Sequence, residues 1–297
     1  MCDRMVKSSL QDQDRETVAR LESSYDIEVL EVANDGYGLK PTLINGRPVD
    51  RRNWPEVIRI TVGNGGCTAT LVGPNCAITA AHCGRNGATG NLELFDGQRI
   101  PFTVIQMPQY QNGAAHDLSL LKLTRNVSVP FAAVGFGHTF VQGQEVLLAG
   151  YGCTQPGGTG GNDGILRIGP SRILGFSGTD VVSEWRERNG AALCFGDSGG
   201  PMFSSEASAG SRVLVAVNSK GNIRDTNYNM RLDLAEVRTF LTESASREGL
   251  RIKGLNWDEG GGGGNGEHTD ARRALSELEK EVNDVSLKLQ QLRQVIG

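Results

Sequence analysis

The feature that most constrains the fold is a long series of short apolar, β-branched runs between residues 44 and about 246, separated by Gly, Asn and Pro. Examples are VIRITV at 57–62, CTATLV at 67–72, CAITAA at 76–81, LSLLKL at 118–123, EVLLAG at 145–150 and RVLVAV at 212–217. Runs of this length, with few helical patterns among them, predict an antiparallel all-β barrel or sandwich. The clearest helical pattern of the region, LAEVRTFLTESA at 234–245, falls at its end.

Charge and hydropathy exclude several classes of partner. The net charge of −4 gives no reason to expect nucleic acid or an anionic membrane as a partner. No apolar run approaches the roughly 18–20 residues that a membrane span needs. The N-terminal MCDRMVKSSLQDQDRE has no apolar core of a signal peptide. We therefore expect a cytoplasmic protein; the alternative is a secreted one whose signal is absent from this chain.

The cysteines show no metal-binding spacing. They are Cys2, Cys67, Cys76, Cys83, Cys153 and Cys194, with no C-x-x-C pair and no clustered histidines. A structural zinc site is therefore not expected, and motifs for nucleotides or other cofactors are absent. The count permits disulfides, whereas the missing signal argues against an oxidising compartment, so the redox state stays open.

The chain divides into four regions that differ in composition and in the pattern of apolar residues. A polar N-terminal segment, 1–43, precedes the β-rich region 44–246. A linker at 247–270 contains the glycine-rich EGGGGGNGEHTD, and a strongly patterned segment, 271–297, follows it.

The last segment has heptad periodicity. Its a and d positions are all apolar: Leu275, Leu278, Val282, Val285, Leu289, Leu292 and Ile296. The pattern predicts a coiled-coil helix that self-associates or binds a partner helix. The alternative is a single amphipathic helix packed on the β domain, which the five-glycine tether disfavours.

One serine has the setting of a nucleophile. Ser198 lies in CFGDSGGP, and a serine hydroxyl becomes nucleophilic when a base takes its proton and a third group orients that base. His82 in ITAAHCG is the candidate base, and Asp117 in HDLSLLKL the candidate orienting group. Each alone is more simply a turn, structural or capping residue. Together, their chain order matches one of the three known orders of the Ser-His-Asp triad.

These motifs resemble those of the trypsin/chymotrypsin-like serine proteases. TAAHC resembles the catalytic-histidine motif, DLSLLKL the aspartate motif, and GDSGGP matches the nucleophile motif in full. INGRPVDRRNWP resembles the mature N-terminal pattern, although Arg47 stands where a glycine is usual. The resemblance implies two six-stranded antiparallel barrels with a C-terminal helix, the coiled-coil helix being separate.

The resemblance also implies the catalytic roles. Ser198 would attack a carbonyl, His82 would accept and then return the proton, and Asp117 would hold the imidazole in its tautomer. The N–H groups of Gly196 and Ser198 would form the oxyanion hole.

By the same resemblance, residues 219–221 would border the substrate. Ser219 would lie beside the triad, and the backbone of 219–221 would pair with the substrate strand. Lys220 stands where an aromatic residue is usual, which puts an apolar contact in doubt and favours acidic residues upstream of the cut. Gly221 would leave one wall of the specificity pocket open.

The other pocket walls imply a preference for small or medium apolar residues. Ala192 resembles the pocket floor, where an aspartate would indicate cleavage after Arg or Lys. The opposite wall is Thr226 or Asn227, because the alignment is ambiguous by one residue. Either side chain makes the pocket shallower, whereas Asp225 turned into the pocket would restore basic specificity.

The resemblance further implies disulfides. Cys67 and Cys83 would bracket the histidine, Cys153 and Cys194 would form a second bridge, and Cys76 would be a buried hydrophobic residue.

Asp197 raises a question of activation. In the family, this aspartate pairs with an α-ammonium made when a pro-segment is removed, which implies a cut between Leu43 and Ile44. Residues 1–43 would then be a pro-region, and a buried Asp197 without a cation would leave the uncut enzyme inactive. The alternative is an accessory segment that is never removed.

The sequence thus predicts a serine endopeptidase acting on proteins or peptides, made as a zymogen and regulated or assembled through its C-terminal helix. The alternatives are a protease-like interaction module without activity, and an esterase that uses the same triad.

Overall fold

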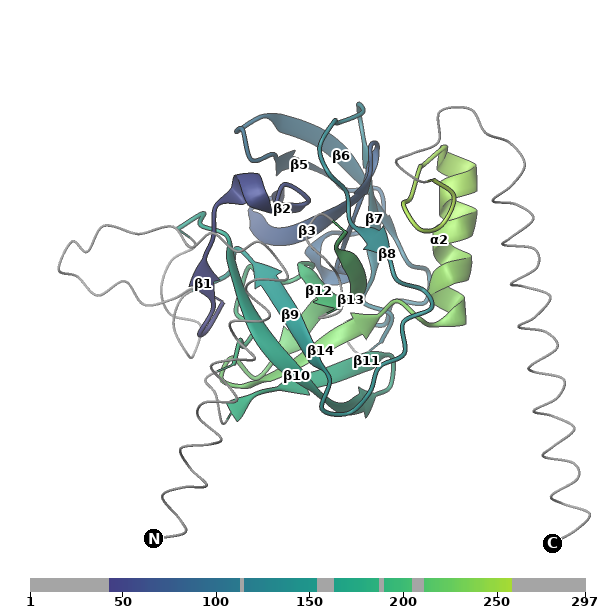
Figure 1. Ribbon diagram of the computed structural model, residues 1–297. Helices are drawn as coiled ribbons and strands as arrows, with labels where there is room; N and C mark the ends of the chain where they lie inside the picture. The colour runs from purple at the N-terminus through teal and green to yellow at the C-terminus, as the bar shows by residue number, and fades with distance from the viewer. Residues whose placement is uncertain (1–42, 113–114, 154–162, 187–189, 205–210, 258–297) are drawn as a thin grey trace, which may run out of the picture. The chain divides into compact units, whose positions relative to one another are not determined.

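The computed structural model describes residues 43–112, 115–153, 163–186, 190–204 and 211–257 (Figure 1). Three predictions fall outside these residues: the pro-region before Leu43, the glycine-rich linker and the coiled-coil helix at 271–297.

The first barrel is built by the N-terminal half of the described chain. Its strands close in the order β2-β3-β4-β7-β6-β5, and every pair is antiparallel. In β2, Ile58 and Ile60 are buried while Arg59 between them is not, which is the two-residue period of a strand with one face in the core. The strands are β2 (Val57–Val62), β3 (Gly65–Gly73), β4 (Cys76–Thr79), β5 (Thr89–Glu93), β6 (Arg99–Gln106) and β7 (Ser119–Leu123).

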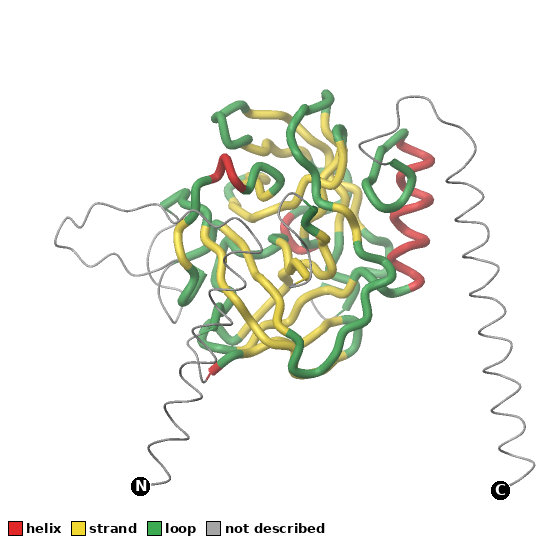
Figure 2. The backbone as a smooth tube through the Cα atoms, in the orientation of Figure 1, coloured by secondary structure: helices red, strands yellow, loops and turns green. Residues whose placement is uncertain are grey.

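The second barrel follows in sequence. Its strands run in the order β10-β11-β14-β13-β12-β9, and pairing of β10 with β9 closes them. They are β9 (Glu145–Gly150), β10 (Arg167–Ser177), β11 (Asp180–Glu184), β12 (Pro201–Ser204), β13 (Val213–Gly221) and β14 (Thr226–Arg231). Short β1 (Arg47–Pro48) pairs with β10, and β8 (Ala133–Val134) pairs in parallel with β13. Strands dominate the trace in Figure 2.

A single core cluster joins the two barrels. It contains Ile78 and Leu120 of the first barrel together with Leu147, Phe203 and Val217 of the second. Since apolar burial is the main stabilising contribution, this shared core fixes one barrel against the other. Residues that lie between the two barrels are therefore on a rigid support.

Helical elements are few among the described residues. Two 3₁₀ turns, η1 (Arg51–Asn53) and η2 (Ala81–Cys83), lie in the first half, and α2 (Ala235–Glu248) follows the second barrel. The helix packs Val237 and Leu241 into the shared core and ends at Gly249, whose left-handed φ of 65° suits a glycine cap.

The packed region extends past the boundary expected at residue 246. Leu250 and Ile252 are buried, and the ring of Trp257 packs edge-on against Phe131 with centroids 5.5 Å apart. Residues 247–257 thus belong to the domain and not to the linker, and this part of the prediction is wrong. Within the described residues no helix is both long and apolar enough to cross a membrane.

The prediction of an all-β chain folded as two six-stranded antiparallel barrels with a C-terminal helix is confirmed.

Candidate active site

His82 and Asp117 meet where two paired strands end. His82 lies in η2, just after β4, and Asp117 comes just before β7; the β4–β7 ladder pairs Thr79 with Ser119 and so brings them together. Two hydrogen bonds join them: the His82 N–H donates to Asp117 Oδ1 at 2.9 Å, and the Nδ1 to Oδ2 distance is 2.7 Å. With Nδ1 facing the carboxylate, the tautomer protonated there leaves Nε2 as the free acceptor.

Asp117 is held as a carboxylate. It is buried, and Ser219 Oγ donates to Oδ2 at 2.6 Å. Burial alone would raise the pKa of Asp117, but the hydrogen bonds from His82 and Ser219 and the His82 charge hold it below its ordinary value. The aspartate can thus orient the imidazole and stabilise its charged form.

The nucleophile turn depends on two glycines. Gly196 has a φ of 103° and Gly199 a φ of 82°, in the region that favours glycine. A Cβ on Gly199 would lie 2.0 Å from Thr79 Oγ1, so nothing larger fits there. Between them, Ser198 is half-buried.

Thr68 of β3 fastens this turn to the first barrel. Its N–H donates to the Ser198 carbonyl at 2.8 Å, and its Oγ1 donates to the Gly196 carbonyl at 2.8 Å. Sγ of Cys83, the residue after His82, lies 3.7 Å from the same Ser198 carbonyl oxygen. The turn that carries Ser198 is thereby held beside Cys83, the residue that follows His82.

Asp197 is a buried carboxylate beside the nucleophile. It accepts hydrogen bonds from the N–H groups of Gly152 at 2.8 Å and Cys194 at 2.9 Å. Complete burial raises the pKa of Asp197 to about 7, although those N–H groups and the charge of Arg167 lower it. A cation brought next to this carboxylate would restore its charge.

The segment expected to hold the new N-terminus lies close by. The Ile44 carbonyl accepts from the Ala192 N–H at 2.9 Å, and Ile44 packs in a small cluster with Ala192, Cys153 and Cys194. Leu43 is wholly buried and has a φ of 46°.

Ala192, the residue expected at the floor of the specificity pocket, is buried. Strand pairing sets Asn227 opposite Gly221. The Asn227 Oδ1 accepts from the Leu193 N–H at 2.8 Å and lies 3.7 Å from where a Cβ on Gly221 would be. Thr226 points elsewhere, since its Oγ1 donates to Glu184 Oε2 at 2.7 Å. Of the two candidates, Asn227 therefore lies on the side that faces Gly221.

Asp225 is held away from this position. Its carboxylate pairs with Arg186 at 3.0 Å and accepts from the Asn222 amide at 2.6 Å in the turn between β13 and β14.

Lys220 is paired with a second buried acid. Its Nζ lies 2.6 Å from Asp180 Oδ2, and its side chain remains 41% exposed. Burial raises the pKa of Asp180, Lys220 lowers it, and the charge of Asp117 raises it further. The ammonium is thus already neutralised, which removes the reason to expect acidic substrate residues there.

Sequence reasoning missed both Thr68 and Asp180. Thr68 lies inside an apolar run, and Asp180 follows the turn residues GT, so each has the signature of an ordinary strand or turn residue. No local pattern distinguishes them, because their partners are distant in sequence.

Both disulfides are formed, Cys67 with Cys83 and Cys153 with Cys194. Cys76 is a buried thiol, and burial raises its pKa to about 12.

Two antiparallel barrels with a His–Asp pair and a glycine-flanked serine at their junction define a chymotrypsin-like serine protease fold. The family model described as Trypsin matches residues 43–239, and the chain belongs to that family. A trypsin-like protease of Streptomyces glaucescens is 23% identical over 205 residues, which cover 61% of this chain and 73% of that protein. Mus musculus neutrophil elastase is 27% identical over 195 residues, covering 56% and 70%.

A solved structure has the same fold. Neuropsin, a serine protease expressed in the limbic system of mouse brain, superposes with a TM-score of 0.55 at 20% identity, over 67% of this chain and 98% of that one.

Proposed function

We propose that the protein is a serine endopeptidase that hydrolyses peptide bonds through an acyl-enzyme. The observation that supports this most directly is the doubly hydrogen-bonded Asp117, which His82 and Ser219 both engage at 2.7 and 2.6 Å. An aspartate so fixed orients a general base, and the nucleophile motif lies on the turn that contacts Cys83, the residue next to that base.

In this mechanism, Ser198 attacks the carbonyl carbon while His82 Nε2 takes its proton and then delivers it to the leaving amine. Asp117 stabilises the imidazolium formed in between. The N–H groups of Gly196 and Ser198 stabilise the oxyanion, and each such donor contributes about 3 kcal/mol to the transition state.

The test is covalent labelling of the purified full chain with an organophosphonate, followed by mass mapping, alongside hydrolysis of matched peptide and ester substrates. Labelling at Ser198 with peptide hydrolysis that Ser198→Ala abolishes supports the proposal. Labelling with ester turnover alone indicates an esterase, and no labelling of either the uncut chain or the chain cut before Ile44 indicates an interaction module.

The pocket favours small or medium apolar side chains before the cut bond. Ala192 offers no charge for Arg or Lys, and the Asn227 amide shortens the space opposite Gly221. Asp225, the acid that would reverse this preference, is engaged by Arg186.

Activation is proposed to require a free amine near Ile44. Asp197 is buried, and its high pKa marks a carboxylate without sufficient cationic compensation. A cut between Leu43 and Ile44 would create that amine. N-terminal sequencing of wild type and Ser198→Ala distinguishes a chain cut there from an uncut chain.

Residues 271–297 are proposed to bind a second copy or a partner helix through their heptad face. Tethered copies would raise the local concentration at which molecules cut one another. Sedimentation of the full Ser198→Ala chain, against one that ends at residue 270, tests this: loss of a concentration-dependent oligomer supports self-association.

A further inference from the structure

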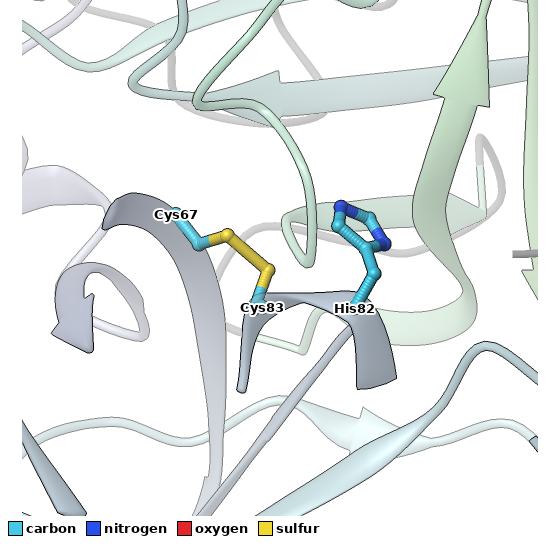
Figure 3. Close-up of side chains that lie close together, drawn as sticks. All are labelled: Cys67, His82 and Cys83. Carbon is cyan, nitrogen blue, oxygen red and sulfur yellow. A yellow bond between two sulfur atoms is a disulfide. The ribbon is translucent and has the colours of Figure 1, made fainter. Parts of the chain in front are cut away.

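Three potential metal ligands gather beside the candidate serine. The ligand atoms of Cys67, His82 and Cys83 all lie within 4.8 Å of one another. Figure 3 shows the ring nitrogen farther from the His82 backbone on the side of the disulfide. In the folded protein the two sulfurs are bonded to each other, so neither is a thiolate.

The distances suit zinc once that bond is opened. A tetrahedral Zn²⁺ holds sulfur and nitrogen at about 2.0–2.3 Å, which sets its ligands about 3.3–3.8 Å apart. The sulfurs would have to separate and the imidazole to approach by an ångström or two. Cys67 lies on β3 and Cys83 in η2, with Cα atoms 6.2 Å apart, so rotation of the side chains can supply much of this change.

His82 is already oriented as a metal ligand. Histidines that bind metals commonly donate their second ring N–H to a carboxylate, which fixes the ring and strengthens the free nitrogen as a donor. Asp117 makes that contact with Nδ1 at 2.7 Å, leaving Nε2 as the donor atom. The arrangement that prepares a general base also prepares a zinc ligand.

The site is within reach of solvent. Cys67 and Cys83 are half-buried and the His82 side chain is 34% exposed, whereas Cys153 and Cys194 of the other disulfide are buried at 3% and 5% exposure. A reductant should therefore reach the Cys67–Cys83 bond first.

We propose that reduction of the Cys67–Cys83 disulfide creates a Zn²⁺ site of two thiolates and His82 Nε2 that switches the enzyme off. A dithiol reductant supplies two electrons and two protons, becomes a disulfide itself, and leaves two Cys thiols. Each thiol releases its proton as Zn²⁺ binds, and water fills the fourth position.

Zinc binding would prevent catalysis because it occupies the lone pair of His82 Nε2. Nε2 bound to zinc cannot take a proton from Ser198, so the base is lost while the metal stays. Metal binding stands independently of the proposed function; inhibition rests on it.

Binding is tested with Co²⁺, which reports thiolate ligation by an intense near-ultraviolet charge-transfer band. The full-length Ser198→Ala protein is titrated before and after treatment with a phosphine reductant, with thiols counted in both states. The band is expected only after reduction, with Zn²⁺ displacing Co²⁺. Affinity should rise about 100-fold or more on reduction, because the oxidised site offers one ligand in place of three.

Two variants locate the ligands. Cys67→Ser with Cys83→Ser should lose the band, whereas Cys153→Ser with Cys194→Ser, which removes the other disulfide, should keep it. The comparison of oxidised and reduced Ser198→Ala protein needs no cysteine variant, so the absence of a band after reduction overturns the proposal even where a cysteine variant does not fold.

Inhibition is tested on active enzyme with a peptide substrate. Zn²⁺ should abolish hydrolysis by the reduced protein at concentrations that leave the oxidised protein active, and a chelator should restore it. No thiolate band after verified reduction, or equal inhibition in both redox states, overturns the proposal. A band in a protein without peptidase activity would refute the proposed function and leave the metal site standing.

Discussion

The backbone N–H of Thr68 donates to the carbonyl oxygen of Ser198 at 2.8 Å, a bond that crosses from the first barrel to the second. The Thr68 hydroxyl meanwhile donates to the Gly196 carbonyl and accepts from the Tyr151 N–H at 3.1 Å. Each peptide unit is planar, so these bonds fix the peptide units that follow Gly196 and Ser198 and hold the turn on both sides of the nucleophile. One threonine of β3 thus supports the turn that carries the proposed oxyanion hole.

Thr68→Val should weaken this support. Valine keeps the shape and the N–H but loses the hydroxyl, so the Gly196 carbonyl is released and the Tyr151 N–H is left buried without its acceptor. We expect kcat to fall about tenfold or more, short of the roughly 100- to 1,000-fold lost with an oxyanion donor itself. The free energy of unfolding should fall by about 1–3 kcal/mol.

Thr61→Val is the matched control. Its hydroxyl makes only a long contact of 3.4 Å to the Asn91 carbonyl on the exposed side of β2, so both quantities should stay near wild type. Equal kcat for Thr68→Val and wild type, measured at saturating peptide, would show that the turn is held by other means.

The Lys220–Asp180 pair should set the pH range of activity. Asp180 interacts electrostatically with Asp117 and His116, and its charge is balanced by Lys220 at 2.6 Å. Asp180→Asn leaves the ammonium unbalanced near the triad, which disfavours the protonated imidazolium of His82. The acid limb of the kcat/KM profile should therefore move to lower pH, by roughly half a unit after solvent screening.

Reversal of the charge change provides the control. Lys220→Met should move the acid limb to higher pH, because the ionised Asp180 carboxylate is then unbalanced. The double variant, which removes both charges, should return the acid limb to the wild-type position. If all three profiles coincide with wild type, the pair is too well screened to influence the triad. A change in KM alone would assign the pair to substrate binding.

Asp197 should make the uncut chain less stable as pH rises. Its folded pKa of about 7 exceeds the ordinary 3.8, so the folded state holds a proton that the unfolded state has released. The contribution of Asp197 to the free energy of unfolding is therefore greatest below about pH 4, falls by a few kcal/mol as the pH rises toward about 7, and is flat above it. Denaturant unfolding of uncut Ser198→Ala, compared with Ser198→Ala carrying Asp197→Asn, measures this slope.

The Ser198→Ala protein that also carries Asp197→Asn should lose the fall in stability with rising pH. The surface change Asp96→Asn, made in its place, should leave that fall unchanged. A cut chain with a free amine near Asp197 should also lose it, because the cation stabilises the ionised carboxylate. A fall that persists in the Asp197→Asn protein would assign it to another group.

The sequence predicted what local chemistry determines. The apolar runs at 57–62 and 145–150 became β2 and β9 without change: part of β2 alternates as a half-buried strand does, and β9 is a short run that is buried from Val146 onward. The helix expected at 234–245 is α2, extended to Glu248. Both disulfide pairings came from the family resemblance, since spacing alone leaves the connectivity open.

What the sequence could not predict depends on distant partners and on register. Thr68 acts through bonds to residues of the other barrel, and Asp180 acquires its role only when β11 lies beside β14 and Lys220. The segment 247–257 has no clear periodicity, so the sequence alone assigns it to the linker and does not predict that it packs on the core. The choice between Thr226 and Asn227 was set by an irregularity in the β13–β14 ladder between Asn218 and Lys220, which shifts the pairing by one residue.

That choice can be tested through substrate preference. Asn227→Gly should deepen the pocket opposite Gly221, whereas Thr226→Gly, whose side chain contacts Glu184 instead, should not. On peptides that differ only in the residue before the cut, wild type should prefer Ala or Val to Phe, Arg or Lys. The Phe-to-Ala ratio of kcat/KM should rise at least about tenfold in Asn227→Gly, the lower end of what one methylene group contributes in an apolar pocket. An equal rise in Thr226→Gly would mean that the wall belongs to the other residue, and a wild-type preference for Arg or Lys would mean that a carboxylate reaches the pocket after all.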